Sequence, residues 1–108
     1  MEDSMLTKVV YNSSHGGFSI SVEALTRMQE LGFTGEANVN SLHNDFAYLY
    51  DCARHDPILV QVVEELGKKA NGLGSDLRIT EVFGPYRIEE YDGSETVYEP
   101  DDYTWITP

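Results

Sequence analysis

The clearest hydrophobic pattern in the chain predicts an amphipathic helix that begins at Pro57 and ends before Asn71-Gly72. Its apolar residues fall on one stripe at helical spacing, namely Ile58, Leu59, Val62, Val63, Leu66 and Ala70. Asp56 suits the N-cap, because its carboxylate can accept a hydrogen bond from a first-turn N–H group, and Pro57 suits the first helical position. The pattern therefore predicts a surface helix with one buried side.

Weaker patterns predict the elements before this helix. Residues 6–12 are rich in β-branched and aromatic side chains and indicate a strand. Residues 12–17 form a polar, glycine-rich loop, and residues 22–31 place apolar side chains on one face of a second helix. Residues 33–45 look irregular, whereas the alternating aromatics of residues 46–50 favour a short strand.

The last third of the chain reads as strands. Residues 77–83 indicate one strand, and Asp92-Gly93 between residues 86–91 and 94–99 predicts a β-hairpin, because a type I′ turn needs positive φ at both central residues. No long linker divides the chain, so we expect a single domain, 1–108. The order of elements predicts an α+β fold: a two-layer sandwich of a small, mostly antiparallel sheet with two main helices and a C-terminal β-hairpin.

Composition narrows the class of protein. The hydrophobic content of 41% is ordinary for a globular domain. No apolar run approaches the roughly 20 residues that span a membrane, so we expect no membrane partner. The acidic N-terminal segment lacks an apolar signal region, and the single cysteine, Cys52, fits a reducing compartment. We therefore expect a cytoplasmic protein.

The net charge of −12 is the compositional feature that most restricts the possible binding partners. It argues against direct binding of nucleic acid, which needs clustered lysine and arginine side chains, and it permits a basic protein partner. Carboxylates are dense on the predicted hairpin, at Glu89, Glu90, Asp92 and Glu95. Because alternate strand residues share a face, several of them would project together. They could imitate phosphates in a basic groove, hold a divalent ion, or only keep a solvated hairpin from edge pairing.

Two segments could bind an anion. The 12–17 loop lies between a strand and a helix, where backbone N–H groups can surround a phosphate, although it lacks a Walker lysine and the dinucleotide-binding glycine spacing. The alternative is a tight turn with positive φ. At the main helix, Arg54 could clamp a phosphate and His55 could donate to it or move protons. The alternative is that Asp56 only caps the helix, Arg54 pairs with Asp51 or Asp56, and His55 is solvated.

Two further groups of side chains have ordinary explanations. Four side chains could hold zinc or supply a Cys–His pair, but their spacing matches no standard zinc motif: His15, His43, Cys52 and His55. We therefore expect no metal and no cofactor. Five aromatic residues could stack on a base or pack within the sheet: Tyr86, Tyr91, Tyr98, Tyr103 and Trp105. We expect Trp105 and Ile106 to pack rather than to end a loose tail.

Three blocks in this order resemble a family of short proteins of unassigned function from tailed phages and large DNA viruses. They lie in residues 8–21 (KVVYN and GGFSIS), 54–67 (RHDPILVQVVEELG) and 86–95 (YRIEEYDGSE), about half of the chain. His15 stands where the family usually has an aromatic residue, and the acidic ending at Asp101-Asp102 replaces a more basic one. The resemblance implies a phage or viral accessory protein of the host cytoplasm that counters host defence.

The leading hypothesis is a non-enzymatic protein that binds a small anionic, nucleotide-like ligand. Its candidate ligand-binding residues are Asn12, His15, Gly16, Gly17, Arg54, His55 and Asp56. The alternative is an acidic inhibitor that binds a basic host protein through Glu89, Glu90, Asp92 and Glu95. A hydrolase that uses His55 and Asp56 is a third hypothesis. The ligand hypothesis requires the 12–17 loop to lie beside residues 54–56. The oligomeric state stays open, because the sequence has no heptad or other symmetry signal.

Overall fold

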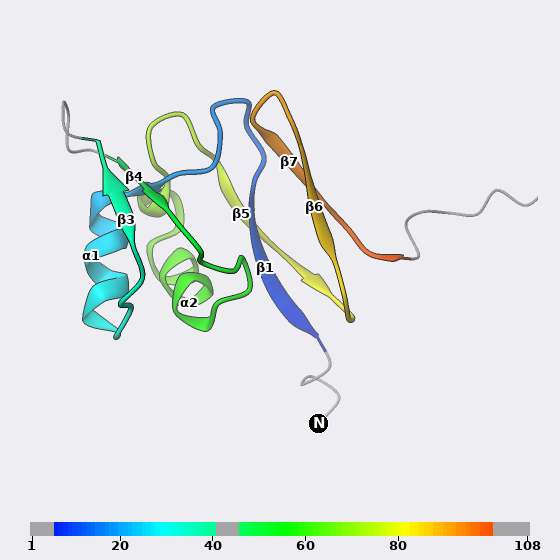
Figure 1. Ribbon diagram of the computed structural model, residues 1–108, viewed down its shortest axis with the longest axis horizontal. Helices are drawn as coiled ribbons and strands as arrows, with labels where there is room; N and C mark the ends of the chain where they lie inside the picture. Colours follow the sequence, from blue (N-terminus) through cyan, green and yellow to red (C-terminus); the bar gives the residue numbers. More distant parts are fainter. Residues whose placement is uncertain (1–5, 41–45, 101–108) are drawn as a thin grey trace, which may run out of the picture.

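The computed structural model describes residues 6–40 and 46–100, which form the α+β fold that the sequence predicts (Figure 1). The helices are α1 (Val22–Glu30), α2 (Pro57–Leu66) and the 3-10 helix η2 (Gly67–Ala70). The strands are β1 (Thr7–Asn12), β2 (Ile20–Ser21), β3 (Ala37–Val39), β4 (Phe46–Leu49), β5 (Leu77–Val82), β6 (Arg87–Tyr91) and β7 (Ser94–Tyr98). The sequence predictions for His43, Asp101, Asp102, Tyr103, Trp105 and Ile106 lie outside the described residues.

The described strands pair in antiparallel fashion and are divided among three small sheets, β1–β5, β2–β4–β3 and β6–β7. Side chains alternate across β1 and β5, so Val10 and Ile79 face the helical core while Val9 and Val82 are buried on the opposite face. Strand β7 contacts β1 on that side. The β1–β5 pair therefore lies between the helices and the hairpin (Figure 1).

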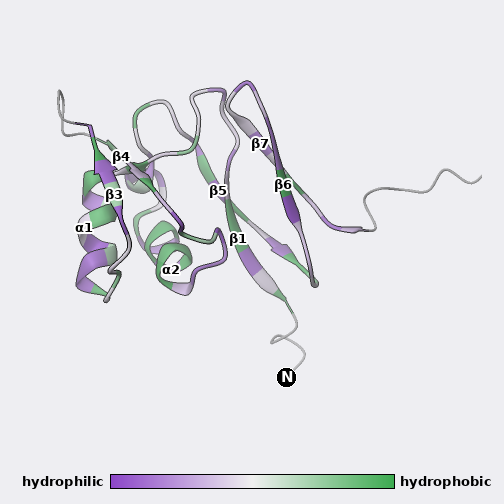
Figure 2. Cartoon of the chain, in the orientation of Figure 1, coloured by the Kyte–Doolittle hydropathy of each residue, from purple (hydrophilic) through white to green (hydrophobic). Residues whose placement is uncertain are grey.

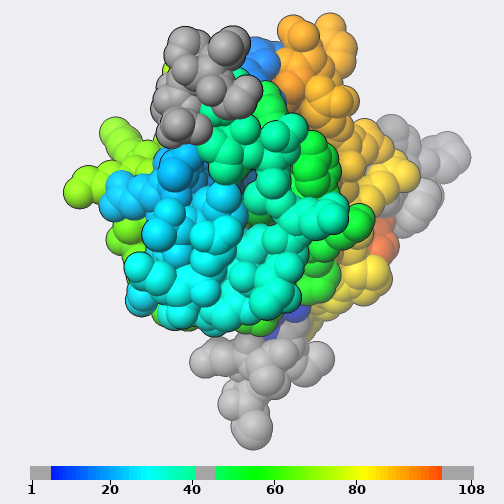
Figure 3. Space-filling view, turned by 60° about the vertical axis from the view of Figure 1, so that its left-hand side comes forward, coloured from blue at the N-terminus to red at the C-terminus, as the bar shows by residue number. Residues whose placement is uncertain are grey.

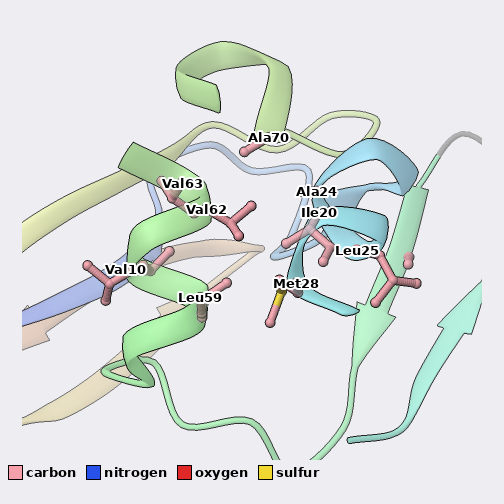
Figure 4. Packing of buried hydrophobic residues seen from close by; sticks show 11 residues of the cluster. Val10, Ile20, Ala24, Leu25, Met28, Leu59, Val62, Val63 and Ala70 are labelled. Atoms are coloured by element: carbon pink, nitrogen blue, oxygen red, sulfur yellow. The ribbon is translucent and has the colours of Figure 1, made fainter. Parts of the chain in front are cut away.

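The hydrophobic core lies between α1, α2 and the inner face of β1, as Figure 4 shows. Met28 from α1 and Leu59 and Val62 from α2 are at most 1% exposed, and Ile20 is fully buried beside them. Burial of each such side chain is worth about 1.5–3 kcal/mol. In Figure 2, green, the colour of hydrophobic residues, is prominent along α2, while purple, the colour of hydrophilic residues, covers much of β6. The apolar stripe of α2 is therefore scaffold.

Helix α2 begins as predicted and ends earlier than predicted. The Asp56 Oδ1 atom accepts hydrogen bonds from Ile58 N at 2.8 Å and Leu59 N at 3.3 Å, and Pro57 opens the helix. The α-helix ends at Leu66 because Gly67 adopts a positive φ of 57°, and η2 carries the chain to Ala70. Within residues 6–40 and 46–100, no helix combines the length and apolarity needed to cross a lipid bilayer.

Strand β4 confirms the predicted extended segment near residue 46, and it organises the second sheet. It pairs with β2 on one edge and with β3 on the other. Strand β3 lies in the segment that the sequence predicts to be irregular. Three residues are too few to carry a strand pattern of their own, and pairing with β4 defines them as a strand. Figure 3 shows β3 and α1 together on one face of the molecule, with the hairpin at its edge.

The C-terminal hairpin confirms the prediction made from Asp92-Gly93. Asp92 has a φ of 54° and Gly93 a φ of 91°, as a type I′ turn requires, and Tyr91 pairs with Ser94. The turn lies at one end of the molecule, next to the loop that follows β1 (Figure 1). The connection from β5 to β6, residues 83–86, lies at the other end (Figure 1).

Candidate functional site

A buried carboxylate on the hairpin is the centre of the polar structure. Glu95 lies on β7 and is 8% exposed. Its two oxygens accept hydrogen bonds from Arg54, with Nη1–Oε1 at 2.6 Å and Nη2–Oε2 at 2.9 Å. Its Oε1 atom also accepts a hydrogen bond from Asn12 N at 2.8 Å. Glu95 therefore provides hydrogen-bond acceptors for both the guanidinium of Arg54 and the backbone N–H group at the end of β1.

Arg54 is held from two further sides. Its guanidinium carbon lies 3.6 Å from the centroid of the Phe18 ring, a cation–π contact. Its backbone carbonyl accepts a hydrogen bond from Val10 N at 2.8 Å. The expected local partners, Asp51 and Asp56, are not the ones that Arg54 uses, since the Asp56 carboxylate caps α2 and Glu95 takes the guanidinium. Arg54 thus joins β1, β7 and the start of α2.

Asn12 connects three loops. Its side chain is fully buried, and Nδ2 donates to the carbonyls of Ser14 at 2.7 Å and Gly93 at 2.8 Å. Its Oδ1 atom accepts from Asp76 N at 2.7 Å and from the Ser14 hydroxyl at 3.1 Å. These contacts fill the hydrogen-bonding capacity of the amide. An anion at this position would have to displace bonds within the protein.

The glycine-rich loop behaves as a tight turn. Gly17 has a φ of 88°, and a Cβ atom on Gly16 would overlap the carbonyl of Gly74. The N–H group of Ser13 donates to Asp76 O at 2.9 Å, and that of Gly16 donates to the Ser14 hydroxyl at 3.2 Å. Helix α1 starts only at Val22, so its N-terminus does not open onto this loop. The loop follows the alternative stated for it, a turn that needs positive φ.

His15 and His55 lie at opposite ends of the molecule. The exposed His15 ring places Nδ1 3.0 Å from the carbonyl of Asp92, at the hairpin turn. The exposed His55 ring places Nδ1 2.6 Å from the Tyr86 hydroxyl, and the two rings meet edge to face. Burial raises the pKa of Tyr86, so its hydroxyl keeps its proton at neutral pH.

The candidate ligand residues therefore fall into three places. Asn12 and Arg54 lie side by side, since both donate hydrogen bonds to Glu95 Oε1. The ligand hypothesis requires the 12–17 loop to lie beside residues 54–56, and these two residues meet that requirement. His15, Gly16 and Gly17 lie at the hairpin turn, and His55 lies beside Tyr86. Asp56 is occupied as the cap of α2. The hollow that His55 lines, together with Thr7, Gly84, Pro85 and Tyr86, includes none of the other candidates.

Hollows on the surface gather at the connection from β5 to β6. Pro85 lines three of them. One, of about 320 Å³, is lined by Thr7, His55, Gly84, Pro85 and Tyr86. Another, of about 200 Å³, is lined by Pro85, Tyr86, Arg87, Tyr98 and Pro100. The sequence groups the tyrosines as aromatics, but it does not indicate that Tyr86 and His55 would meet.

The charges on the described surface are mostly negative. Five of the seven basic side chains form ion pairs with acids. The pairs are Lys8–Glu64, Arg27–Glu65, Arg54–Glu95, Arg78–Asp76 and Arg87–Glu89. The remaining two are the exposed Lys68 and Lys69 in η2. Most of the cationic charge is therefore neutralised within the protein.

The candidate partner-binding acids differ in exposure. Glu89, Glu90 and Asp92 are exposed, whereas Glu95 is buried in its pair with Arg54. Glu90 Oε2 accepts a hydrogen bond from Gly93 N at 2.6 Å, which supports the turn. Glu95 is therefore a structural residue in this arrangement, and the other three form the acidic surface of the hairpin.

Metal-binding and thiol chemistry have no assembled site in the described ranges. No group of three or more histidine, cysteine, aspartate or glutamate side chains there could hold a metal ion. Burial, with a smaller contribution from Asp56, raises the pKa of Cys52 to about 11, and Arg54 opposes this. Cys52 is therefore a protonated thiol at neutral pH, unlike an activated nucleophile.

Comparison with known proteins adds no relative. A scan against protein-family models, a search of curated proteins and a search of solved structures each returned no match to the chain. The resemblance to phage and viral proteins therefore stays a prediction. The structure does connect the three blocks that carry it, because Asn12, Arg54 and Glu95 come from the first, second and third block.

Proposed function

We propose that the chain is a non-enzymatic accessory protein that binds a basic surface of a host protein. The observation that carries this proposal is the distribution of charge: Arg54 is neutralised by Glu95, and most acids of the described residues lie on the surface. A cationic partner would be attracted to such a surface, and charge complementarity raises the association rate and suppresses wrong partners. The phage or viral origin and the role against host defence rest on the resemblance alone.

The hairpin turn is the part of the surface that we assign to the partner. Glu90 and Asp92 are both exposed there. Two exposed carboxylates at a hairpin turn are complementary to a basic protein surface.

Neutralisation of the turn tests this function. The variant Glu90→Gln/Asp92→Asn keeps the acceptor for Gly93 N and a residue that tolerates positive φ, and it removes two charges. The control Glu36→Gln/Asp51→Asn removes two exposed charges elsewhere, and Asp51 has a matching φ of 53°. Proteins captured from host lysate are identified by mass spectrometry, and the purified partner is titrated with each variant. We expect salt-sensitive binding that only the turn variant loses. Equal binding by both variants would refute the proposal.

A second candidate function is binding of a nucleotide-like ligand, and one observation favours it. The hollow of about 320 Å³ beside His55 and Tyr86 presents an imidazole and a phenol ring to solvent. A base could stack there without any cationic side chain. Calorimetry with cyclic and ADP-ribose-type nucleotides tests it, with His55→Ala as the variant and His15→Ala as the control. We expect micromolar binding that only His55→Ala weakens, and no heat at micromolar ligand would exclude it.

A further inference from the structure

The outer strand of the hairpin offers an edge for pairing. In the part of the chain that the structure describes, β6 pairs with β7 alone. Because a two-residue turn joins Tyr91 to Ser94, this pair and the Glu89–Thr96 pair exchange backbone hydrogen bonds. The backbone N–H and C=O groups of Ile88 and Glu90 therefore point away from β7. They can pair with a further strand.

The edge of β1 that does not pair with β5 is, by contrast, covered by other parts of the chain. Val10 N donates to the Arg54 carbonyl, and Asn12 N donates to the Glu95 carboxylate, each at 2.8 Å. These two contacts cover β1, as native proteins commonly do with strand edges. Strand β6 carries instead two exposed, oppositely charged side chains, Arg87 and Glu89, which form an ion pair with each other on one face and would extend it into an alternating network in a dimer paired along β6. Among the described residues, no such contact covers the edge of β6, so the charges of Arg87 and Glu89 determine which strand can pair with it.

We propose that β6 pairs in antiparallel fashion with β6 of a second copy of this chain. Residues with outward backbone groups must face each other, which leaves few registers. Relative to a register with Ile88 opposite the partner's Ile88, a shift of two residues in one direction places Ile88 opposite the partner's Glu90 and brings Glu89 against Glu89. A shift of two residues in the other direction brings Arg87 against Arg87. Both arrangements oppose like charges. Placing Ile88 opposite the partner's Ile88 brings Arg87 opposite the partner's Glu89, and the two-fold axis repeats that contact.

In the same register, the Tyr91 side chain of each copy lies next to a hollow on the surface of the other copy. Tyr91 is the most exposed large hydrophobic side chain of the described residues, at 80%. In this register it lies opposite the partner's Pro85. Pro85, Arg87 and Tyr98 line the hollow of about 200 Å³, and Arg87 and Tyr98 are strand partners on the face that carries Tyr91. Each Tyr91 thus enters the hollow of the other copy. Charge, register and shape agree on one dimer with a four-stranded sheet.

Exchanging the charges tests this dimer directly. Sedimentation of the full chain is followed over a concentration series for the wild type, Arg87→Glu, Glu89→Arg and the double variant R87E/E89R. Each single change opposes like charges twice, so we expect a dimer dissociation constant raised about tenfold, and the double variant restores the attraction and the dimer. The controls Lys69→Glu and Glu36→Arg make the same charge changes on exposed residues away from β6 and should not weaken the dimer.

A second measurement locates the interface. Hydrogen exchange at the Ile88 and Glu90 amides should slow as the protein concentration rises, while the Glu89 amide, already paired with β7, should not change. A monomer at every concentration, a dimer that the single variants do not weaken, or a double variant that does not recover would each overturn the proposal. The dimer does not rest on the proposed function, because its test needs no host protein.

Discussion

Arg54 and Glu95 lie 41 residues apart in the chain and form a two-pronged ion pair, with Nη1–Oε1 at 2.6 Å and Nη2–Oε2 at 2.9 Å. Because Asn12 N binds the same carboxylate and Val10 N binds the Arg54 carbonyl, this pair ties the start of α2 to β1 and to the hairpin. Polar residues that the sequence offers as ligand groups are thus used to hold the layers together. An anion at Arg54 would compete with Glu95.

Removal of the Glu95 carboxylate should destabilise the fold. Glu95→Ala leaves a charged Arg54 and the Asn12 N–H group without their acceptor, and breaking a buried pair costs about 3–5 kcal/mol. The Arg54 side chain keeps 23% exposure, so we expect a loss near the lower limit, about 3 kcal/mol in the free energy of unfolding, measured in urea. Glu95→Gln should lose less, because it retains an oxygen for Asn12. Exposed Glu90→Gln is the control, and equal unfolding midpoints for Glu95→Ala and Glu90→Gln would contradict the prediction.

Two glycines with nearly the same φ should differ in their tolerance of alanine. Gly17 has a φ of 88° with nothing within 4 Å of an added Cβ, so Gly17→Ala should cost only the conformational term, about 1 kcal/mol. Gly93 has a φ of 91°, and its added Cβ would overlap the His15 carbonyl and Gly17 N. Gly93→Ala should therefore cost more, about 2–4 kcal/mol in all. Thermal unfolding of both variants measures the difference, and similar melting temperatures would show that the loop and the turn are not in contact.

Asp76 should contribute to stability in a pH-dependent way. A hydrogen bond from Ser13 and a second from Arg78 lower the pKa of Asp76 from its ordinary value of 3.8. Because the pKa is lower in the folded state, this contribution is complete above 3.8 and is lost as the pH falls through the folded pKa. The free energy of unfolding of wild type should therefore exceed that of Asp76→Asn near neutral pH, with the difference shrinking in acid. A difference that stays constant with pH would argue against the interaction.

Local signals account for the parts of the fold that the sequence predicts well. The cap of α2 depends on Asp56 and its own first turn, and the hairpin depends on Asp92-Gly93, so neighbouring residues contain the necessary information. Strand β3 and the division into three sheets depend on pairing across the chain. A segment as short as the three residues of β3 cannot indicate from its own sequence which distant strand it will pair with.

The candidate site is less predictable for the same reason. Alternation on β7 groups Glu95 with one face of the hairpin, but only the packing of that face against β1 decides that Glu95 is buried. Arg54 has nearer acids in the sequence, Asp51 and Asp56, and yet it pairs with the distant one. Phe18 beneath Arg54 lies within the first block and carries no local signal of that contact. Long-range packing therefore turns candidate binding groups into structural ones.

The thiol of Cys52 should react slowly in the folded protein. Burial is the main cause that raises its pKa to about 11, so at about pH 8 roughly one thiol in a thousand is the reactive thiolate. Alkylation by iodoacetamide, followed by mass spectrometry, should therefore be slow at that pH and should accelerate about tenfold for each unit of pH until about pH 10. The urea-unfolded chain is an internal control, because Cys52 is the single cysteine and exposure restores its ordinary reactivity. Equal rates in the folded and unfolded chains at about pH 8 would show that the thiol is accessible and that its pKa is not raised.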